Sequence, residues 1–413
     1  MSAGSPVPAR LRTALGERYA WIALLAALFA CFVPGNATAA TNLYRLLVVV
    51  PMLLCVRPAD AAPIWRQVCA RWFLLLCAWL SLTLWWDGWS HKDTKLLLRE
   101  LNVLALFYWV YLVSCAHRDR IGLMLDGWIA IGTLGAVLIF ADWPDPWTPD
   151  WAQHAQSLRG VFNHHVLVGW ALATVALVAL YRFLTATSRR ALAVHGVVAL
   201  ALGLLVLWVQ ARGAYVVLGS GGLLILLLHP GRRALVIAGI GMLLALTLLL
   251  LFPEQLALVG DQLLERGSAG RLDIWRQGWQ QMLASGWRLW FGHGLSAEAA
   301  VVVGDTHAMH YHNLLLNQLF YAGVVGVLLY LGWLASLLRQ ALRDPGLRLW
   351  GALVVAMQFG FLTDGDRLFV NPSALLLAFL LPAFLLGFGV SAPGSAITPA
   401  PDREPRSARS WPR

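Results

Sequence analysis

Apolar runs follow one another along almost the whole chain, and this succession constrains the fold more than any other feature. A membrane-spanning helix needs about 20 mostly apolar residues, and the 413-residue chain holds twelve candidates joined by polar connections. The candidates lie near residues 19–34, 44–57, 67–86, 101–116, 121–141, 164–182, 192–210, 214–229, 234–252, 312–336, 349–363 and 373–390. With 59% hydrophobic and 13% charged residues, the composition excludes an ordinary soluble globule. The sequence therefore predicts an all-α, polytopic integral membrane protein with about twelve transmembrane helices.

Charged residues are distributed unevenly between the two sides of these runs. If both termini are cytoplasmic, most of the 31 Lys and Arg residues fall in the termini and the short inside connections, and the acidic residues lie mainly outside. This is the positive-inside pattern. The formal charge of +10 therefore reflects topology, and we expect no nucleic-acid partner. The first run has no small-residue cleavage site after it, so we expect a retained helix and not a signal peptide.

One long polar interruption divides the chain. We expect five segments: a tail over 1–20, nine transmembrane helices over 21–252, a large helical outside loop over 253–311, three transmembrane helices over 312–390 and a tail over 391–413. Both tails are rich in Pro, Ser and Arg, which predicts disorder. No internal repeat indicates an inverted-repeat transporter.

Two helices are expected in the outside loop, over 253–266 and 271–284. The second would place four side chains on a shared face, by their spacing near i, i+4: Arg271, Trp275, Trp279 and Met282. Such a helix suits the membrane surface, with its Trp side chains at the level of the headgroups.

Eleven basic residues lie outside, where topology does not explain them. They are Arg45, Lys92, Lys95, Arg99, Arg159, Arg212, Arg266, Arg271, Arg276, Arg288 and Arg367. Arg212 sits in the tight connection between two apolar runs, beside Gly213; it either snorkels at a helix end or binds a ligand that approaches the glycine. Arg271 opens a predicted helix, where partial positive charge disfavours a cation unless an anion compensates. It is either a solvated surface residue or a phosphate ligand.

His312 stands where the chain returns to the membrane, and ionisable groups at such positions are often functional. It either caps backbone groups at the helix start or, as a neutral imidazole, takes a proton from a sugar hydroxyl. Asn313 could orient the imidazole or a substrate.

Metal and cofactor sites are not expected. His164, His165, His307, His310 and His312 match no zinc spacing, and the sequence shows no cysteine or carboxylate that completes them. The five cysteines fall in or beside apolar runs and are expected to pack there. The Gly292-His293-Gly294 triplet follows no strand, so it does not indicate a nucleotide loop.

Several of these elements, in this order, resemble the O-antigen ligase/polymerase superfamily. They are Arg212-Gly213 at a tight outside turn, then Arg271-Leu272-Asp273-Ile274-Trp275 and Gly292-His293-Gly294 in the loop, then His312-Asn313-Leu314-Leu315. Arg159-Gly160-Val161-Phe162-Asn163-His164 is similar to another element of that family. The motifs span roughly residues 155–335. The chain looks most like the branch that joins O-antigen to lipid A–core in Gram-negative bacteria.

This resemblance implies a GT-C-like, metal-independent, inverting glycosyltransferase of the inner membrane, with its active site on the periplasmic face. The donor would be a glycan on undecaprenyl diphosphate and the acceptor lipid A–core, in contact with membrane lipids and without a cofactor. The family's diphosphate-binding and base roles fall on Arg212, Arg271 and His312. Other substrate contacts are expected from Arg159, His164, His165, Trp275, Arg288 and Asn313.

Three other functions remain open. An O-antigen polymerase would use the same donor and extend the glycan on its own carrier. A transporter of lipid-linked glycans would place charges at mid-membrane, whereas nearly all ionisable groups outside the cytoplasmic connections lie at the outer face, with Asp126 as the exception. A non-catalytic scaffold would tolerate loss of His312. The sequence predicts neither the sugars nor the oligomeric state.

Overall fold

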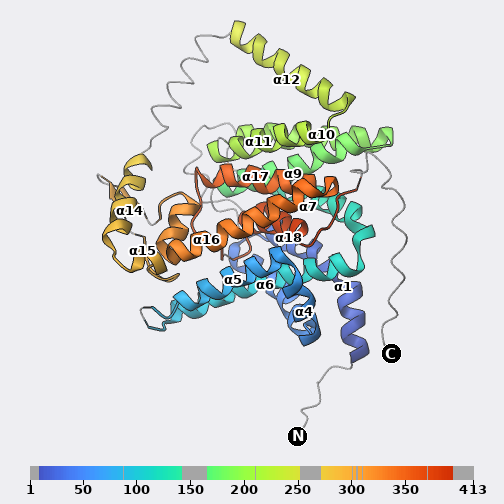
Figure 1. Cartoon of the computed structure of the whole chain (residues 1–413). Helices are drawn as coiled ribbons and strands as arrows, with labels where there is room; N and C mark the ends of the chain where they lie inside the picture. The colour runs from blue at the N-terminus through green and yellow to red at the C-terminus, as the bar shows by residue number, and fades with distance from the viewer. Residues whose placement is uncertain are drawn as a thin grey trace.

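The computed structural model describes residues 9–86, 88–141, 165–209, 211–251, 271–299, 301–303, 306–308, 310–369 and 371–393. Figure 1 shows a bundle of long helices, with α14 and α15 at one end and α12 apart from the rest. The elements are α1 (Ala9–Phe32), α2 (Ala37–Tyr44), η1 (Arg45–Val49), α3 (Val50–Cys55), α4 (Pro58–Arg66), α5 (Val68–Thr83), α6 (His91–Ala116), η2 (Arg118–Arg120), α7 (Ile121–Ala141), α9 (His165–Thr185), α10 (Arg189–Trp208), α11 (Arg212–Leu228), α12 (Arg232–Leu251), α14 (Arg271–Ala284), α15 (Arg288–Phe291), β1 (Val301–Val303), β2 (Thr306–Ala308), α16 (Leu314–Arg343), η4 (Pro345–Leu347), α17 (Arg348–Phe361), η5 (Leu376–Leu380) and α18 (Leu381–Gly387).

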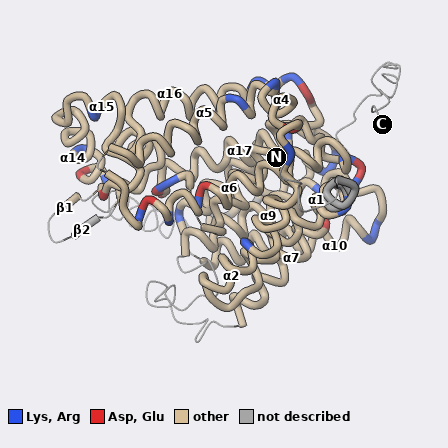
Figure 2. Tube along the Cα trace, turned by 90° about the horizontal axis from the view of Figure 1, so that it is seen from below, with Lys and Arg blue, Asp and Glu red and all other residues tan. Residues whose placement is uncertain are grey.

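The structure supports a polytopic membrane protein. Helical residues occur within each of the twelve expected runs. Six helical stretches are long and apolar enough to cross a membrane, and four shorter apolar helices accompany them. The number of crossings thus stays a prediction. Figure 2 shows long stretches of helix without charged residues, and Lys, Arg, Asp and Glu mostly toward the ends of helices.

Two helix starts differ from the expected ones. α1 begins at Ala9, so the prediction of disorder over residues 1–20 is wrong for residues 9–20. α6 begins at His91, ahead of the apolar run expected from residue 101. Ser90 and Asp93 form a capping box there, which satisfies backbone donors of the first turn and starts the helix while its side chains are still polar.

Two π-helical segments each precede a proline. In η1 the N–H of Val50 donates to Arg45 O, and Pro51 follows. In η5 the N–H of Leu381 donates to Leu376 O, and Pro382 follows. Proline has no N–H to donate and its ring crowds the preceding turn, so a wider turn before it accommodates the ring without ending the helix.

Small residues bring the central helices close together. A Cβ on Gly132 of α7 would lie 2.5 Å from Val175 of α9, and one on Gly169 of α9 would lie 2.5 Å from Ala214 of α11. Close backbone approach through small residues is the usual packing mode between membrane helices. Because α9 packs closely against both α7 and α11, it lies at the centre of the bundle and is buried along most of its length.

Asp126, expected to be isolated, is paired. Arg182 binds its two carboxylate oxygens at 2.9 and 2.7 Å, and His195 Nε2 lies 3.3 Å from it. Arg182 ends α9 and belongs to the predicted cytoplasmic side, so the pair ties α7, α9 and α10 together at that end. This contact gives Asp126 a structural role.

α16 is interrupted at Gly323, which has φ 68° and ψ −172°. The N–H groups of His293 and Gly294 donate to the carbonyls of Phe320 and Tyr321, at 2.8 and 3.1 Å. A Cβ on Gly323 would lie 2.3 Å from Trp290 O, so glycine is required for this approach. The Gly292-His293-Gly294 triplet therefore satisfies carbonyls released by the kink.

The described part of the outside loop is not wholly helical. β1 and β2 form a short antiparallel hairpin in which Val301 pairs with Ala308. The expected all-α fold is therefore corrected to a helical fold with one short hairpin in the loop. α14 and α15 pack beside α16 (Figure 1). The loop helix expected over 253–266 lies outside the described residues, as does the C-terminal tail beyond residue 393.

Candidate active site

His312 lies directly before α16 in a conformation that L-residues rarely adopt. Its φ is 49°, unlike that of any other described non-glycine residue, and such a backbone persists only where surrounding contacts hold it. Asn313 is the N-cap: its side-chain oxygen accepts from the N–H groups of Leu315 and Leu316 at 3.0 and 3.2 Å. Asn313 is 7% exposed. Its side chain therefore holds the start of α16 and thereby the position of His312.

Tyr311 fixes the chain on the other side of His312. It is fully buried, its N–H donates to Asn317 Oδ1 at 3.1 Å, and its carbonyl accepts from Trp275 Nε1 at 2.8 Å. Gly278 of α14 lies against its ring, because a Cβ there would come within 2.3 Å of Tyr311. Trp275 and Gly278 thus dock α14 onto the residue next to His312.

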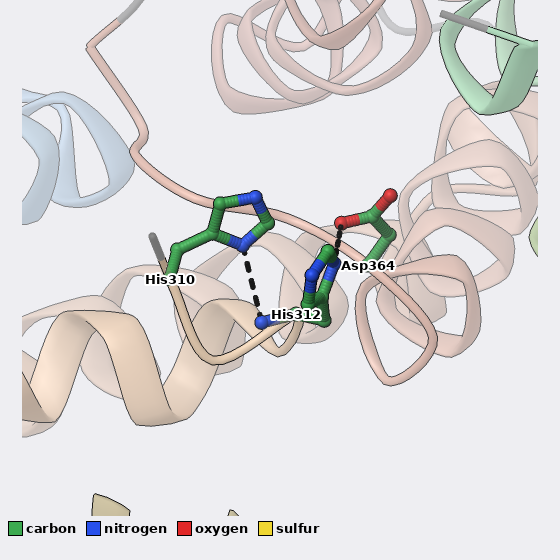
Figure 3. A group of neighbouring side chains, drawn as sticks. All are labelled: His310, His312 and Asp364. Carbon is green, nitrogen blue, oxygen red and sulfur yellow. Dashed lines mark hydrogen bonds and ion pairs between the residues drawn. The ribbon is translucent and has the colours of Figure 1, made fainter. Parts of the chain in front are cut away.

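Asp364 follows the end of α17 and meets the imidazole of His312. Asp364 Oδ1 lies 3.1 Å from His312 Nδ1 (Figure 3) and accepts the N–H of Gly365 at 2.8 Å. Burial acts to raise the pKa of Asp364, but the bond to His312 and its charge, together with the Gly365 N–H, lower that pKa to about 2. The carboxylate is therefore ionised at neutral pH.

This charge state defines the roles of the two imidazole nitrogens. An ionised carboxylate only accepts hydrogen bonds, so the proton of a neutral His312 ring is assigned to Nδ1. Nε2 is then the basic nitrogen. The His312 side chain is 34% exposed and lines the cavity described below. The arrangement fits a general base held in one tautomer.

His310 lies beside this pair. Its Nδ1 accepts the backbone N–H of His312 at 3.2 Å, and the two rings are 4.1 Å apart (Figure 3). His310, His312 and Asp364 each offer one metal-ligand atom, within 4.8 Å of one another. The sequence argument that no carboxylate completes the histidines is thus wrong: Asp364 does, from far along the chain. A cation there would occupy the groups that pair His312 with Asp364.

A cavity of about 260 Å³ opens beside the histidines. Its lining combines apolar and charged side chains: Leu167, Trp170, His310, His312, Leu314, Asp364, Gly365, Asp366, Arg367, Ser373 and Leu375. They come from α9, the start of α16 and the connection between α17 and η5. The cavity therefore forms only when these helices pack together.

Arg367 is the cation of this cavity. Its guanidinium donates to Ala297 O at 3.1 Å and to the Tyr321 hydroxyl at 3.2 Å, and stacks over the Tyr321 ring at 4.5 Å. The Asp366 carboxylate is 4.0 Å from Arg367 and accepts from the Tyr321 hydroxyl at 2.8 Å. Arg99 of α6 is near enough to be repelled by Arg367 and attracted by Asp366.

Gly213, the residue after Arg212, packs against Trp170 of the cavity lining. A Cβ on Gly213 would lie 2.4 Å from Thr363 Oγ1 and 3.2 Å from Trp170 Nε1. Thr363 precedes Asp364, and Trp170 lines the cavity. The first turn of α11 therefore packs against Thr363 and Trp170, with Gly213 permitting the approach, and Arg212 begins this turn.

The other predicted site residues lie farther out or have packing roles. Arg271 begins α14 and Arg288 begins α15, with its guanidinium over Trp287 at 5.5 Å, and neither lines the cavity. His165 begins α9. On α14 the buried residues are Ile274, Gly278 and Met282, whereas Trp279 is 47% exposed. The placement of this helix at the membrane surface stays a prediction. Arg159 and His164 lie outside the described residues.

Sequence reasoning missed the residues that complete the site. Asp364, Asp366 and Arg367 were counted only as outside charges, and Trp170 and Ser373 were not singled out. One signal was present: Thr363-Asp364-Gly365-Asp366-Arg367 is a compact ionisable run between two apolar ones. Such a run at a membrane interface is as informative as a single histidine.

Two comparisons with known proteins find similarity to O-antigen ligases. Residues 196–331 match the family model described as O-antigen ligase. Over 390 residues the chain is 25% identical to the O-antigen ligase of Pseudomonas aeruginosa, in an alignment that covers 92% of this chain and 85% of that protein. The family match includes Arg212, Arg271 and His312, whereas Asp364 lies beyond it. Both comparisons therefore show that this chain is similar to O-antigen ligases.

Proposed function

We propose that this chain transfers O-antigen polysaccharide from undecaprenyl diphosphate to lipid A–core, with inversion and without a metal ion, at the periplasmic face of the inner membrane. The observation that carries the proposal is the bond between His312 Nδ1 and the ionised Asp364. The similarity to an O-antigen ligase over 92% of the chain supports the substrate class.

In this reaction His312 is the general base. Its Nε2 takes the proton from the acceptor hydroxyl as that oxygen attacks the anomeric carbon of the donor sugar. The bond from that carbon to the diphosphate oxygen breaks, and undecaprenyl diphosphate leaves with the electron pair. Asp364 stabilises the imidazolium that forms and keeps the ring in its productive tautomer, as the carboxylate does in other His–Asp pairs.

Arg212 and Arg271 are assigned to the donor diphosphate. Negative charge grows on the leaving oxygen in the transition state, and guanidinium groups suit phosphate oxygens. Arg212 begins α11 next to Gly213, which packs against Trp170 of the cavity lining. Arg271 begins α14, the helix whose Trp275 bonds to the carbonyl of Tyr311. With two guanidinium groups in place, the leaving group needs no divalent cation.

The remaining site residues divide into two groups. Asn313 and Trp275 are assigned positioning roles, because their side chains hold the backbone on either side of His312. Contacts to sugars are assigned to Arg159, His164, His165 and Arg288. The outside loop is placed in the periplasm and both termini in the cytoplasm, and the five-segment division of the chain is retained in this proposal.

The test is reconstitution of the purified protein with lipid A–core and an undecaprenyl-diphosphate glycan. Wild type is expected to form the joined product with or without a chelator, and His312→Ala to lower the rate by about 10²–10⁴-fold. His91→Ala, which removes an exposed histidine at the start of α6, is the matched control and should retain the rate. Normal transfer by His312→Ala would refute the base assignment. Glycan lengthening without lipid A–core would instead identify a polymerase.

A further inference from the structure

An open groove of about 650 Å³ is formed by α3, α4, α5 and α6. Its lining is apolar except for one cluster of hydrogen-bonded side chains, Arg57, Asp60 and Tyr108. Leu53 and Trp65 belong to the lining and are exposed, so the groove opens onto the surface of the bundle. It shares no residue with the cavity of the candidate active site.

The groove faces the hydrocarbon of one leaflet. α3, α5 and α6 belong to apolar runs that are expected to cross the membrane, and α4 lies in the connection between two of these runs. Leu101 and Tyr108 of α6 both line the groove, and their separation of seven residues corresponds to about 10 Å along a helix. One leaflet contributes about 15 Å, half of the hydrocarbon core. The groove therefore extends along much of a single leaflet, and α4 marks the side predicted to be cytoplasmic.

The Arg57 guanidinium is held beside the groove by Asp60. Its Nε and Nη2 donate to the two carboxylate oxygens at 3.1 and 3.0 Å, and the Tyr108 hydroxyl donates to the same carboxylate at 2.8 Å. Asp60 is buried, whereas the side chain of Arg57 is 38% exposed. A guanidinium has five N–H groups, and the bonds to Asp60 use two of them. The other three can bond to an acceptor that approaches from the exposed side.

The charge around the groove favours an anion. Asp60 offsets Arg57 within the lining, but Arg66 directly follows Trp65 at the end of α4, and Arg71 lies in the first turn of α5. Residues 57–71 thus hold three cations and one carboxylate, a net charge of +2. Basic residues at the cytoplasmic surface of a membrane attract anionic lipids, and a guanidinium suits phosphate oxygens.

The shape of the groove selects the rest of the ligand. A volume of about 650 Å³ lies within the range of about 300–1,000 Å³ that is typical of ligand sites. Because nearly all of the lining is apolar, a soluble anion would contact only the polar cluster. A phospholipid presents a hydrocarbon chain to the apolar lining and a phosphate to Arg57. Trp65 is about half exposed and suits the level of the headgroups.

We propose that this groove binds an anionic phospholipid of the cytoplasmic leaflet, with an acyl chain along the apolar lining and the phosphate at the Arg57 guanidinium. The site lies apart from the candidate active site, so the inference does not depend on the proposed function. The bound lipid would hold α4 against α3, α5 and α6, which together form the groove.

The first experiment measures the affinity for lipid. Native mass spectrometry of the delipidated full-length protein gives the dissociation constant of the first bound lipid, with phosphatidylglycerol as the anionic probe and phosphatidylcholine as the zwitterionic one. Wild type should bind phosphatidylglycerol about tenfold more tightly, which corresponds to about 1.4 kcal/mol. Arg57→Gln/Asp60→Asn removes both charges and leaves no unpaired buried carboxylate. This double variant should bind phosphatidylglycerol about tenfold more weakly than wild type.

The matched control is Arg276→Gln/Asp273→Asn, which removes an ion pair of the same i, i+3 spacing from exposed α14. It should bind phosphatidylglycerol within about twofold of wild type, the scatter expected for a distant site. If wild type binds both lipids equally, or if Arg57→Gln/Asp60→Asn binds phosphatidylglycerol as its control does, the inference is overturned. Thermal unfolding without added lipid identifies a variant that fails to fold.

A variant that leaves the ion pair intact tests the apolar part of the groove. Ala61 is exposed and lines the groove, so Ala61→Trp should obstruct the acyl chain and weaken phosphatidylglycerol binding about tenfold. Ala284→Trp, at an exposed position on α14, is the matched control and should bind as wild type does. Equal affinities of these two variants would show that the chain lies elsewhere, against the proposal.

The second experiment locates the bound lipid. Phosphatidylglycerol with a photoactivatable acyl chain is cross-linked to the protein in nanodiscs, and the labelled peptides are identified. Labelling should concentrate on α3, α4, α5 and α6 and be lost in Ala61→Trp. Equal labelling of exposed apolar helices such as α10 would indicate unspecific lipid contact and overturn the inference. So would loss of the label to undecaprenyl phosphate at concentrations where unlabelled phosphatidylglycerol does not compete, because the groove would then hold a polyprenyl lipid.

Discussion

Replacing Asp364 with Asn is expected to slow glycan transfer without removing substrate binding. In the proposed reaction the carboxylate stabilises the imidazolium that His312 becomes in the transition state, whereas an amide of the same shape carries no charge. The variant keeps an oxygen that can accept from Nδ1–H, so the position of the ring is largely retained. The loss should therefore fall on kcat, with KM nearly unchanged.

The size of the effect follows from the pKa of Asp364. Interaction with His312 and with the Gly365 N–H lowers that pKa from 3.8 to about 2 in spite of burial. One pK unit corresponds to 1.36 kcal/mol, so the stabilising interactions exceed the cost of burial by about 2 kcal/mol. The side chain is only 16% exposed, so solvent screens little of it. If the imidazolium receives most of this energy, kcat falls about 30-fold.

The assay is the initial rate of transfer at saturating donor and acceptor in reconstituted membranes. Asp273→Asn is the matched control, because Asp273 is an exposed carboxylate on α14 whose contact with Arg276, at 3.8 Å, is solvent-accessible. Its rate should equal that of wild type. A rate for Asp364→Asn within about twofold of wild type, with product of the same linkage, would refute the pairing argument, because it would show that the charge contributes less than about 0.4 kcal/mol.

Four further outcomes can be measured. Gly323→Ala should lower the free energy of unfolding by more than about 2 kcal/mol, because the residue has φ 68° and a Cβ would meet Trp290 O. The control, Gly203→Ala in α10, adds a Cβ that meets nothing and should unfold at or above the wild-type temperature. Equal melting temperatures of the two variants would contradict this prediction. Asn313→Ala should lower the free energy of unfolding by about 1 kcal/mol through loss of the helix cap, and Asn313→Ser should keep most of that stability. Thermal unfolding measures both. Equal stability of the two variants would exclude the capping role. The pKa of Asp364 lies below its value in an unfolded chain, so its contribution to stability is present above about pH 4 and is lost as the pH falls toward about 2. The difference in melting temperature between wild type and Asp364→Asn should therefore narrow below pH 4. A difference that does not change with pH would contradict an ionised pair. Added Zn²⁺ should inhibit glycan transfer by binding to His310, His312 and Asp364. His310→Ala should be less sensitive to Zn²⁺ than wild type. Equal inhibition of the two proteins would show that the inhibiting metal binds elsewhere.

The membrane fold could be inferred from the sequence because it depends on local composition. Every apolar run produces helix, since each run satisfies its own backbone hydrogen bonds whatever its neighbours are. The expectations that failed depend on local detail. α6 starts early because Ser90 and Asp93 cap it, and the β1–β2 hairpin has strands of only three residues, too short for a hydropathy pattern to identify.

The site could be inferred only in part, because local composition can be read from the sequence whereas contacts between distant residues cannot. His312 and Arg212 are visible in sequence as polar groups at the ends of apolar runs. The partner of His312 is not visible in the sequence, because two helices separate Asp364 from it along the chain. A histidine in a sequence does not indicate which side chain its imidazole contacts. Asn313 looked like a substrate ligand because a polar residue beside a base suggests binding, whereas its side chain is occupied by backbone N–H groups.

The separation of His312 and Asp364 along the chain has a consequence for how the enzyme is made. The two residues are 52 positions apart, with α16 and α17 between them. On the ribosome His312 is therefore synthesised first, and it has no carboxylate beside it until α17 has entered the bilayer and turned back. Under the proposed mechanism, activity is therefore acquired only near the end of biogenesis. A chain interrupted before that point would be a nearly complete membrane protein whose His312 has no carboxylate partner.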